Sequence, residues 1–459
     1  MQENHIFQDT IVAVATPHGM GGLAVARVSG PQAFDLVAMR WQGAPLPAMS
    51  SHSAHLGQVL DSAGNVLDQV VLTVFRAPHS FTGEDVVEIS CHGSTWIQQQ
   101  LLTTLIDAGC RLAGPGEFTR RAFANGRMDL SQAEAVADLI ASQSATAHRV
   151  AMNQMRGRFS GELGRLRERL LHFVALIELE LDFGEEDVTF ADRSSLVLLA
   201  QEIQTVVHRL AHSFHAGNAI KNGLPVAIVG ATNAGKSSLL NALLGDDRAL
   251  VSDIHGTTRD VIEDTITLDG TLFRLIDTAG LRQSKDVIER MGMERSIAKM
   301  EQAQIVLWVI DSTETASEVE RHAAMIVPHC TDKQLIAVFN KADLNAAPEV
   351  TLPPEVTTIH MSAHREADVE RLRQLMVRVA ALPTVDENAV IVTNVRHYEA
   401  LLRAGQAIGR VVDGLQSGVS GDLVSQDIRE CLHHLGEITG EITTDAILGE
   451  IFAHFCVGK

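Results

Sequence analysis

The sequence has few of the features that mark exported or membrane-spanning proteins. Its five cysteines are odd in number and include no Cys-x-x-Cys pair, which argues against a disulfide framework and against a zinc site. No apolar run approaches the ~20 residues that are needed to cross a bilayer, and the start, Met1–His5, is not a signal peptide. We therefore expect a cytoplasmic protein without a membrane span.

A basic excess is also missing. The chain has 37 basic and 57 acidic residues, and its formal charge is −20. Proteins that bind nucleic acid usually draw affinity from a basic surface, so such contact would need a local patch or a partner. Four arginines recur at helical spacing and could form a stripe, although a solvated helix face explains them more simply: Arg156, Arg158, Arg165 and Arg169.

The most informative stretch that is present is Gly230–Ser237, which reads Gly-Ala-Thr-Asn-Ala-Gly-Lys-Ser. It follows an apolar, β-branched run and precedes a helical one, which is the context that a phosphate-binding loop requires. Backbone N–H groups in such a loop point at phosphate oxygens. Lys236 is expected to reach the β- and γ-phosphates and Ser237 to ligate Mg²⁺.

Further motifs indicate that the nucleotide is GTP. Asp277–Gly280 follows an apolar strand and fits the element that holds the Mg²⁺ shell and meets the γ-phosphate. Asp343 can accept two hydrogen bonds from guanine that adenine cannot supply. The predicted nucleotide-binding residues are Asn233, Ala234, Gly235, Lys236, Ser237, Ser238, Ser252, Asp253, Ile254, His255, Gly256, Thr257, Thr258, Asp277, Thr278, Ala279, Gly280, Asn340, Lys341, Asp343, Ser362 and Ala363.

The glutamine that orients the attacking water in Ras-like sites is missing here, because Leu281 stands at that position. Arg259, Arg282 or a bound cation could supply the positive charge that hydrolysis needs. Asn233 offers an amide oxygen inside the phosphate loop, and residues 252–257 could fold over it and add carbonyl oxygens, which suits a hard monovalent cation. Alternatively, Asn233 is a turn residue that tolerates left-handed geometry.

The chain is too long for one hydrophobic core, and its patterns divide it into four segments. Residues 1–125 alternate strand-like and helix-like stretches, 126–219 are helical, 220–382 carry the α/β GTPase pattern, and 383–459 are helical again. Helix on both sides predicts a GTPase domain inserted into one helical domain. Ser131 with Glu134 predicts a capping box. The predicted N-terminal strands are Ile11–Ala15, Ala24–Val28, Gln69–Phe75 and Asp85–Ser90, and the predicted helix is Thr95–Ala108.

Stretches outside the GTPase motifs give the chain an end-to-end resemblance to the MnmE (TrmE) family of tRNA modification GTPases. The matching stretches are Asp9–Ala13 through Ser29 and Gly30, Phe81–Ile89, Gly114–Phe123, Asp129–Ala135 and Phe455–Lys459. The resemblance implies a multidomain fold: an α+β N-terminal domain similar to folate-binding domains, a central all-α helical domain, and an inserted Ras-like or Era-like α/β P-loop GTPase domain.

The same resemblance implies a potassium-dependent GTP hydrolase that is activated when two G domains dimerise. It implies that the enzyme, with the FAD-dependent protein MnmG, installs a carboxymethylaminomethyl or aminomethyl group at C5 of the tRNA wobble uridine. The one-carbon donor would be 5-formyl- or methylene-tetrahydrofolate. The implied partners are a second copy of the chain, joined through the N-terminal domain, MnmG in a heterotetramer, and tRNA.

The resemblance also assigns residues. Asn233, Ser252, Ile254 and Thr257 would bind K⁺, and Ser237 and Thr258 would bind Mg²⁺. Glu289 would be catalytic beside Lys236, acting through a water; from the residues alone it would be a solvated helix residue. The implied folate contacts are Arg27, Glu88, Arg127 and Lys459.

Simpler interpretations exist for the folate residues and for the tail. Without the family, Arg27 and Arg127 would be surface salt-bridge residues, and Glu88 would be an outward-facing strand residue. Cys456 would be either a reactive thiol or a buried small hydrophobe. The rival function is an Era-like regulatory GTPase switch in ribosome assembly, which has no reason to carry the Arg27, Glu88 and Arg127 set or the Cys456–Lys459 tail.

Overall fold

The computed structural model describes residues 7–182, 193–245, 264–276, 297–344, 348–380 and 389–458. The chain forms two compact units. The first contains residues 1–140, 154–204 and 403–459, and the second contains residues 141–153 and 205–402. Each unit is described by itself below.

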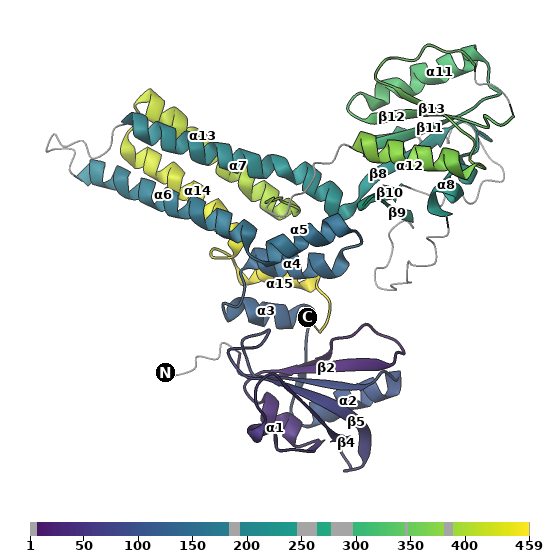
Figure 1. The fold of residues 1–459 in the computed structure, drawn as a ribbon. Coiled ribbons are helices and arrows are strands. Elements are labelled where there is room, and N and C mark those ends of the chain that lie inside the picture. Colours follow the sequence, from purple (N-terminus) through teal and green to yellow (C-terminus); the bar gives the residue numbers. More distant parts are fainter. Residues whose placement is uncertain are drawn as a thin grey trace. The chain divides into compact units, whose positions relative to one another are not determined.

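A mixed seven-stranded sheet forms the N-terminal part of the first unit (Figure 1), with strand order β3-β4-β5-β6-β2-β1-β7. All neighbours are antiparallel except β1 and β7. The strands are β1 (Ile11–Val14), β2 (Leu23–Ser29), β3 (Trp41–Gln42), β4 (Ser53–Leu60), β5 (Val66–Phe75), β6 (Val86–His92) and β7 (Arg111–Leu112). The helical pieces are α1 (Ala33–Ala38), η1 (Leu46–Ala48), α2 (Thr95–Asp107) and α3 (Glu117–Ala124).

The two faces of this sheet differ. Buried residues of β2, β5 and β6 pack with α1 and α2 in one core, in which Leu36 and Leu101 meet Leu72 and Ile89. Because side chains alternate along a strand, the other face carries the intervening residues. In the register, Arg27 of β2 lies opposite Glu88 of β6. Two of the four residues predicted to bind folate, Arg27 and Glu88, therefore lie on the face that α1 and α2 leave uncovered.

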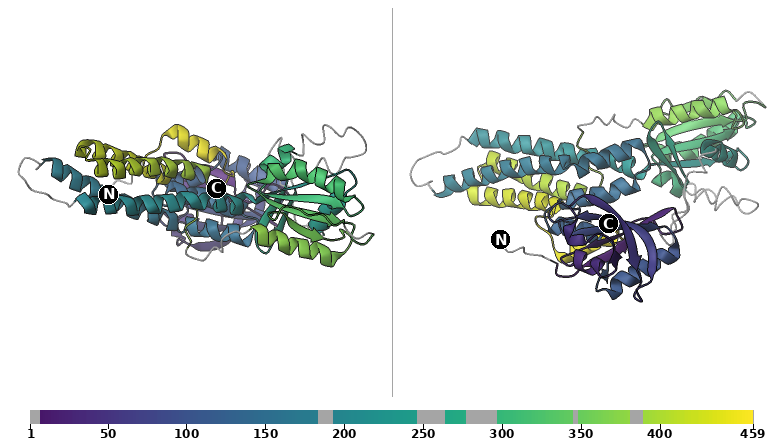
Figure 2. Two further views of the ribbon diagram at one scale, coloured as in Figure 1. Left: turned by 90° about the horizontal axis from the view of Figure 1, so that it is seen from above. Right: turned by 60° about the horizontal axis from the view of Figure 1, so that its bottom comes forward.

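Within the first unit, α6, the first part of α7 (up to residue 204), the last part of α13 (from residue 403) and α14 form a helical bundle, and Figure 2 shows these segments running side by side. Helix α6, which precedes the GTPase region, packs against α14, which follows it, and Arg193 of α7 donates a hydrogen bond to the carbonyl of Leu415 in α13. The helices outside the GTPase region are α4 (Leu130–Ala141), α5 (Ala145–Met155), α6 (Arg158–Asp182), α7 (Arg193–Asn222), α13 (Val395–Ser417), α14 (Gly421–Thr439) and α15 (Asp445–Ala453).

The start of α4 corrects one expectation. The predicted capping box of Ser131 with Glu134 is wrong, because the pair is shifted by two residues. Asp129 accepts a hydrogen bond from the backbone N–H of Gln132 at 2.9 Å, and the Gln132 side chain accepts one from the backbone N–H of Asp129 at 3.0 Å. This reciprocal pair satisfies two of the orphan donors at the helix start, while Ser131 is buried inside the first turn.

A six-stranded sheet with order β13-β12-β11-β8-β10-β9 forms the centre of the second unit. Only β9 and β10 pair antiparallel. Helices α8 and α12 pack on one face, and α11 packs on the other. The elements are β8 (Leu224–Gly230), α8 (Lys236–Leu244), β9 (Asp264–Leu268), β10 (Thr271–Leu275), β11 (Ile305–Asp311), α11 (Ala316–Ile326), η3 (Val327–Cys330), β12 (Gln334–Asn340), β13 (Thr357–His360) and α12 (Glu366–Ala380). None of the described helices combines the length and the apolar character that crossing a membrane requires.

Candidate functional site

The phosphate loop connects β8 to α8, as the sequence predicts. Gly235 precedes the helix with φ +98°, and a Cβ atom there would lie 2.1 Å from the side-chain nitrogen of Asn340. Lys236 donates hydrogen bonds to the carbonyls of Gly230, at 2.9 Å, and Ala231, at 2.6 Å. Burial and the nearby charge of Lys299 lower the pKa of Lys236. A cation and the helix N-terminus therefore lie together, which favours an anion.

Asn340 connects three motifs that are far apart in sequence. Its Nδ2 donates to the carbonyl of Ala234 at 2.9 Å, and its Oδ1 accepts from the N–H of Ala363 at 3.0 Å. Its own carbonyl accepts from Ser312 at 2.6 Å. The phosphate loop and the two predicted base-contacting loops are thus held together by one buried amide.

The predicted guanine acceptor, Asp343, is exposed and stays ionised, because a hydrogen bond with the Ser362 side chain holds its pKa below the usual value. The N–H of Ser362 in turn donates to Asp368 at 3.0 Å. A carboxylate fixed in this way can accept two hydrogen bonds from a guanine edge. Ser237 and Ser238 are both exposed in the first turn of α8.

Sequence reasoning missed two acidic residues that support this site. Asp311 ends β11 beside Asn340 in the register and accepts a hydrogen bond from Lys341 at 2.5 Å. Burial opposes ionisation of Asp311, but the hydrogen bond and charge of Lys341, together with the hydrogen bonds from Thr313, outweigh it and lower the pKa. The other is Asp368. An acidic residue directly after the apolar run Ile305–Ile310 is the signal that could have identified Asp311.

Asn233 has a left-handed backbone, with φ 66°, and its side chain is exposed. This conformation agrees with the turn interpretation and leaves the amide oxygen accessible. The other predicted nucleotide, metal and catalytic residues lie outside the described residues: Ser252, Asp253, Ile254, His255, Gly256, Thr257, Thr258, Asp277, Thr278, Ala279, Gly280 and Glu289, together with Arg259, Leu281 and Arg282.

A second candidate site lies on the uncovered face of the N-terminal sheet. Arg27 forms an ion pair with Glu88 at 2.7 Å, and its guanidinium carbon lies 5.5 Å from the ring centre of Phe81 and 5.7 Å from that of Phe118. Both contacts of Glu88 with Arg27 use Oε1, so among the described residues Oε2 has no partner. Arg27 and Glu88 therefore form a salt bridge, as the simpler interpretation holds, but a half-buried one between aromatic rings.

The C-terminal tail reaches this site. Gly458 offers its carbonyl to Arg27 at 3.3 Å, and Val457 pairs with Pro115 in an isolated β-bridge. Cys456 is exposed, so the interpretation as a buried small hydrophobe is wrong. Lys459 lies outside the described residues. Arg127 is not at the Arg27–Glu88 pair; it lines a neighbouring pocket that also contains Phe81.

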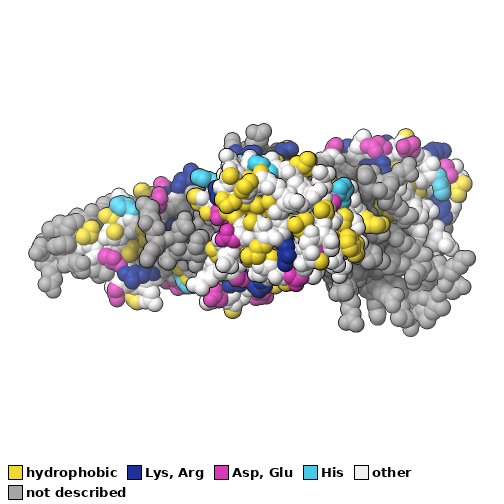
Figure 3. All heavy atoms as spheres, turned by 90° about the horizontal axis from the view of Figure 1, so that it is seen from below, with side chains coloured by type: hydrophobic (Ala, Val, Ile, Leu, Met, Phe, Trp, Pro, Cys, Tyr) yellow, Lys and Arg dark blue, Asp and Glu magenta, His cyan; other side chains and the backbone are white. Residues whose placement is uncertain are grey.

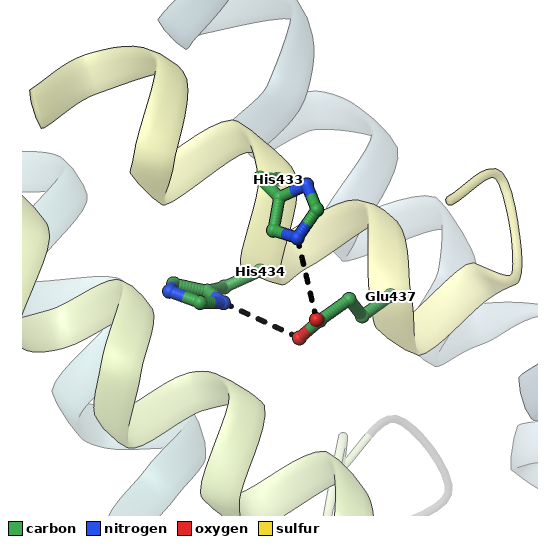
Figure 4. Close-up of side chains that lie close together, drawn as sticks. All are labelled: His433, His434 and Glu437. Atoms are coloured by element: carbon green, nitrogen blue, oxygen red, sulfur yellow. Dashed lines mark hydrogen bonds and ion pairs between the residues drawn. The ribbon is translucent and has the colours of Figure 1, made fainter. Parts of the chain in front are cut away.

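The described residues contain one group of three side chains with metal-ligand spacing, which lies on α14 (Figure 4). His433 and His434 both approach the carboxylate of Glu437, at 3.4 and 3.2 Å. Arg403 also donates to Glu437 at 3.0 Å. Because an arginine already balances the carboxylate, this group is a surface ion cluster rather than a cation site.

Comparisons with known proteins cover almost the whole chain. Residues 10–127 match the family described as GTP-binding protein TrmE N-terminus, and residues 130–456 match the MnmE helical domain. The chain is 55% identical over 465 residues to a tRNA modification GTPase MnmE of Bacteroides thetaiotaomicron, covering 98% of this chain and 100% of the relative. It is 54% identical over 459 residues to that of Parabacteroides distasonis, with the same coverage.

A solved structure of Era in complex with MgGDPNP and a segment of 16S ribosomal RNA matches 40% of this chain and 65% of that chain, with 27% identity. Its TM-score is 0.26, which is too low to support an argument. The family matches, together with the two sheets and the helical bundle, confirm the predicted fold class: an α+β N-terminal domain, an all-α domain and an α/β P-loop GTPase domain.

Proposed function

The chain belongs to the family of tRNA modification GTPases MnmE and is a GTP hydrolase of tRNA modification; from this premise we propose its cofactors, partners and chemistry. Potassium-dependent hydrolysis, driven by dimerisation of G domains, powers installation of a carboxymethylaminomethyl or aminomethyl group at C5 of the wobble uridine. MnmG is the partner, and a tetrahydrofolate supplies the one-carbon unit. The observation that best supports this is the meeting of Arg27, Glu88 and the C-terminal tail outside the GTPase motifs.

The geometry of the nucleotide site supports GTP as the nucleotide that is bound and hydrolysed. Phosphate oxygens replace the loop carbonyls that Lys236 now contacts, and Asp343 accepts hydrogen bonds from the guanine edge. Ser237 and Thr258 would hold Mg²⁺, which neutralises the charge that develops on the phosphates. The preformed Asn340 bridge keeps the phosphate and base loops at a fixed separation.

Asn233 supports the potassium proposal, because its exposed amide lies inside the phosphate loop. An arginine finger raises the rate of GTP hydrolysis by about 10³- to 10⁵-fold, and a cation in its place would supply part of that gain. We expect GTP turnover to rise by at least about tenfold in K⁺ over Na⁺ at equal ionic strength, since even a small share of that gain is large. Asn233→Ala should lose the stimulation and keep GTP binding. Equal rates in both salts would contradict the proposal.

Glu289 is proposed to position the attacking water that Leu281 cannot align. Glu289→Ala should bind GTP with unchanged affinity and lose hydrolysis in single-turnover assays. Retained turnover would remove this role. Glu294→Ala is a nearby control that changes the same residue type.

Arg27 and Glu88 support the folate proposal. A pterin offers an N–H and an amino group side by side, and Glu88 has an oxygen without a partner to accept from them. Glu88→Gln should weaken binding of 5-formyl-tetrahydrofolate by about 10- to 100-fold, the value of one charged hydrogen bond. GTP affinity of the same variant is the control. Unchanged folate affinity would contradict the assignment.

Homodimerisation through the N-terminal domain is supported by apolar side chains on the sheet face that α1 and α2 leave open. Leu56 and Val71 lie opposite each other in the register and are 67% and 39% exposed. Figure 3 shows hydrophobic side chains at the surface of the N-terminal domain. Leu56→Asp should shift the sedimentation coefficient toward the monomer, because the charge would be desolvated in the dimer.

The arginine stripe gives little support to direct tRNA binding. Arg165 pairs with Glu162 and Arg169 pairs with Glu202, so two of its four charges are balanced. We therefore propose that tRNA is held mainly by MnmG. The cytoplasmic location and the domain division 1–125, 126–219, 220–382 and 383–459 remain part of the proposal.

Nucleoside analysis of tRNA from a strain that lacks this protein tests the proposal as a whole. The carboxymethylaminomethyl and aminomethyl derivatives of wobble uridine should disappear. Complementation with Glu88→Gln should fail although the variant still hydrolyses GTP. An unchanged wobble uridine, together with a defect in ribosome assembly, would favour the Era-like switch instead.

A further inference from the structure

A pocket with a volume of about 430 Å³ lies in the N-terminal domain next to the Arg27–Glu88 pair. Two aromatic rings form its apolar walls, and an arginine and two histidines supply its polar groups. Among the residues that the structure describes, no acidic side chain lines it, although the chain as a whole carries a charge of −20. The lining residues are His52, Phe75, His79, Ser80, Phe81 and Arg127.

The loop that forms one wall of the pocket is held in place by hydrogen bonds within the protein. Residues 76–85 are held by their own hydrogen bonds: Ser80 donates to the carbonyl of Glu84 at 2.6 Å, and the N–H of Ala77 donates to Asp85 at 2.9 Å. The side chain of Asn125 donates to the carbonyl of Thr82 at 2.8 Å. A ligand would therefore meet a formed surface and would not have to order the loop.

Arg76 and Arg127, the two arginines at this loop, differ in their contacts. Arg76 donates to backbone carbonyls at 3.1 to 3.3 Å and lies over the ring of Phe34, so it serves the fold. Arg127 has no hydrogen bond or ion pair from its side chain within the described residues, and its stem rests against Gly83, where a Cβ would come within 3.2 Å of it. Among the described residues, Arg127 is thus a cation without an ion-pair partner, and its pocket has no acidic lining residue, which suits a carboxylate or another anion.

Phe81 joins this pocket to the candidate folate site, since the same ring lies 5.5 Å from the Arg27 guanidinium carbon. A folate has a flat pterin at one end and a glutamate tail at the other, and each added γ-linked glutamate brings one more carboxylate. We propose that this pocket binds the glutamate tail of the folate through Arg127, His52 and His79, and that the protein prefers polyglutamylated over monoglutamylated folate. This inference rests on the proposed folate donor.

Isothermal titration of the full-length protein with 5-formyl-tetrahydrofolate as the monoglutamate and as the triglutamate tests the inference. The triglutamate should bind about tenfold or more tightly, as one or two additional charge-assisted hydrogen bonds predict. Arg127→Gln should abolish most of this preference, and Arg127→Lys should retain part of it, because the lysine keeps a charge. His52→Ala with His79→Ala should reduce it further.

Arg120→Gln is the matched control, because Arg120 is a partly exposed arginine on α3 that does not line the pocket. It should leave both affinities unchanged. Equal affinity of the wild-type protein for the two ligands would overturn the tail site and leave the folate proposal standing, and so would a preference that survives Arg127→Gln. Failure of both ligands to bind would overturn the folate proposal and the tail site together.

Discussion

Arg121 is the charged residue whose removal should cost the N-terminal domain the most. It is fully buried, at 0% exposure, and its guanidinium contacts the carboxylates of Asp9 at 2.7 Å, Glu84 at 3.1 Å and Glu117 at 3.1 Å. Glu84 is itself only 3% exposed, and its other oxygen accepts a hydrogen bond from Ser29 at 2.7 Å. Arg121→Met keeps much of the volume and leaves a buried carboxylate without its cation.

Breaking a buried ion pair from one side destabilises a protein by about 3–5 kcal/mol. Arg111 provides the matched control, since it binds Asp9 and Glu117 too, at 2.6 and 2.5 Å, but is half exposed. Arg111→Met should cost about 0–1 kcal/mol, as exposed ion pairs do. Adding Glu84→Gln to Arg121→Met should recover part of the loss, because the unpaired charge is then gone.

Native-state hydrogen exchange of the full-length chain measures this locally. Amides of β1 (Ile11–Val14) and α3 (Glu117–Ala124) report the opening free energy of this part of the domain. Equal losses in Arg121→Met and Arg111→Met would refute the reasoning, because burial would then not decide the cost. A loss below about 1 kcal/mol in Arg121→Met would refute it as well.

The same structure makes three further predictions. Burial opposes ionisation of Asp9 and Glu117, but hydrogen bonds and charges from Arg111 and Arg121, with the N–H of Gly114 at Glu117, outweigh it and lower both pKa values. The stability that these carboxylates contribute is therefore present at neutral pH and lost as the pH falls below about 4. Acid titration followed by circular dichroism would show this loss. Gly235→Ala should abolish binding of a fluorescent guanine nucleotide, because its Cβ would collide with Asn340 and its φ of +98° disfavours any side chain. Iodoacetamide at pH 8 should label Cys456 first in the native protein, because it is the exposed thiol among the five.

Each of these has an internal control. Arg121→Met should flatten the acid dependence, and an unchanged slope would contradict the pKa argument. Gly164→Ala should leave nucleotide binding intact, because a Cβ there meets nothing within 4 Å. Cys431 should react last, since burial raises the pKa of its thiol to about 12; faster labelling of Cys431 than of Cys456 would refute the exposure argument.

The local sequence determined the strand–loop–helix of the phosphate site, because its signal lies in consecutive residues. The predicted strand Ile11–Ala15 and helix Thr95–Ala108 end within one residue of β1 and α2. Strand β4 (Ser53–Leu60) was not predicted, since its sequence alternates weakly and includes a glycine; pairing with β5 along its length makes it a strand. The family resemblance extended the prediction to the fold class.

Only the tertiary structure decided which distant groups meet. Arg27 and the carbonyl of Gly458 lie 431 positions apart in sequence, and no local pattern encodes that contact. Nor does any pattern distinguish the buried Arg121 from the half-exposed Arg111, because the depth of a charge depends on what packs around it. The pocket around Arg127 likewise exists only because the loop at residues 76–85 closes on itself beside the sheet.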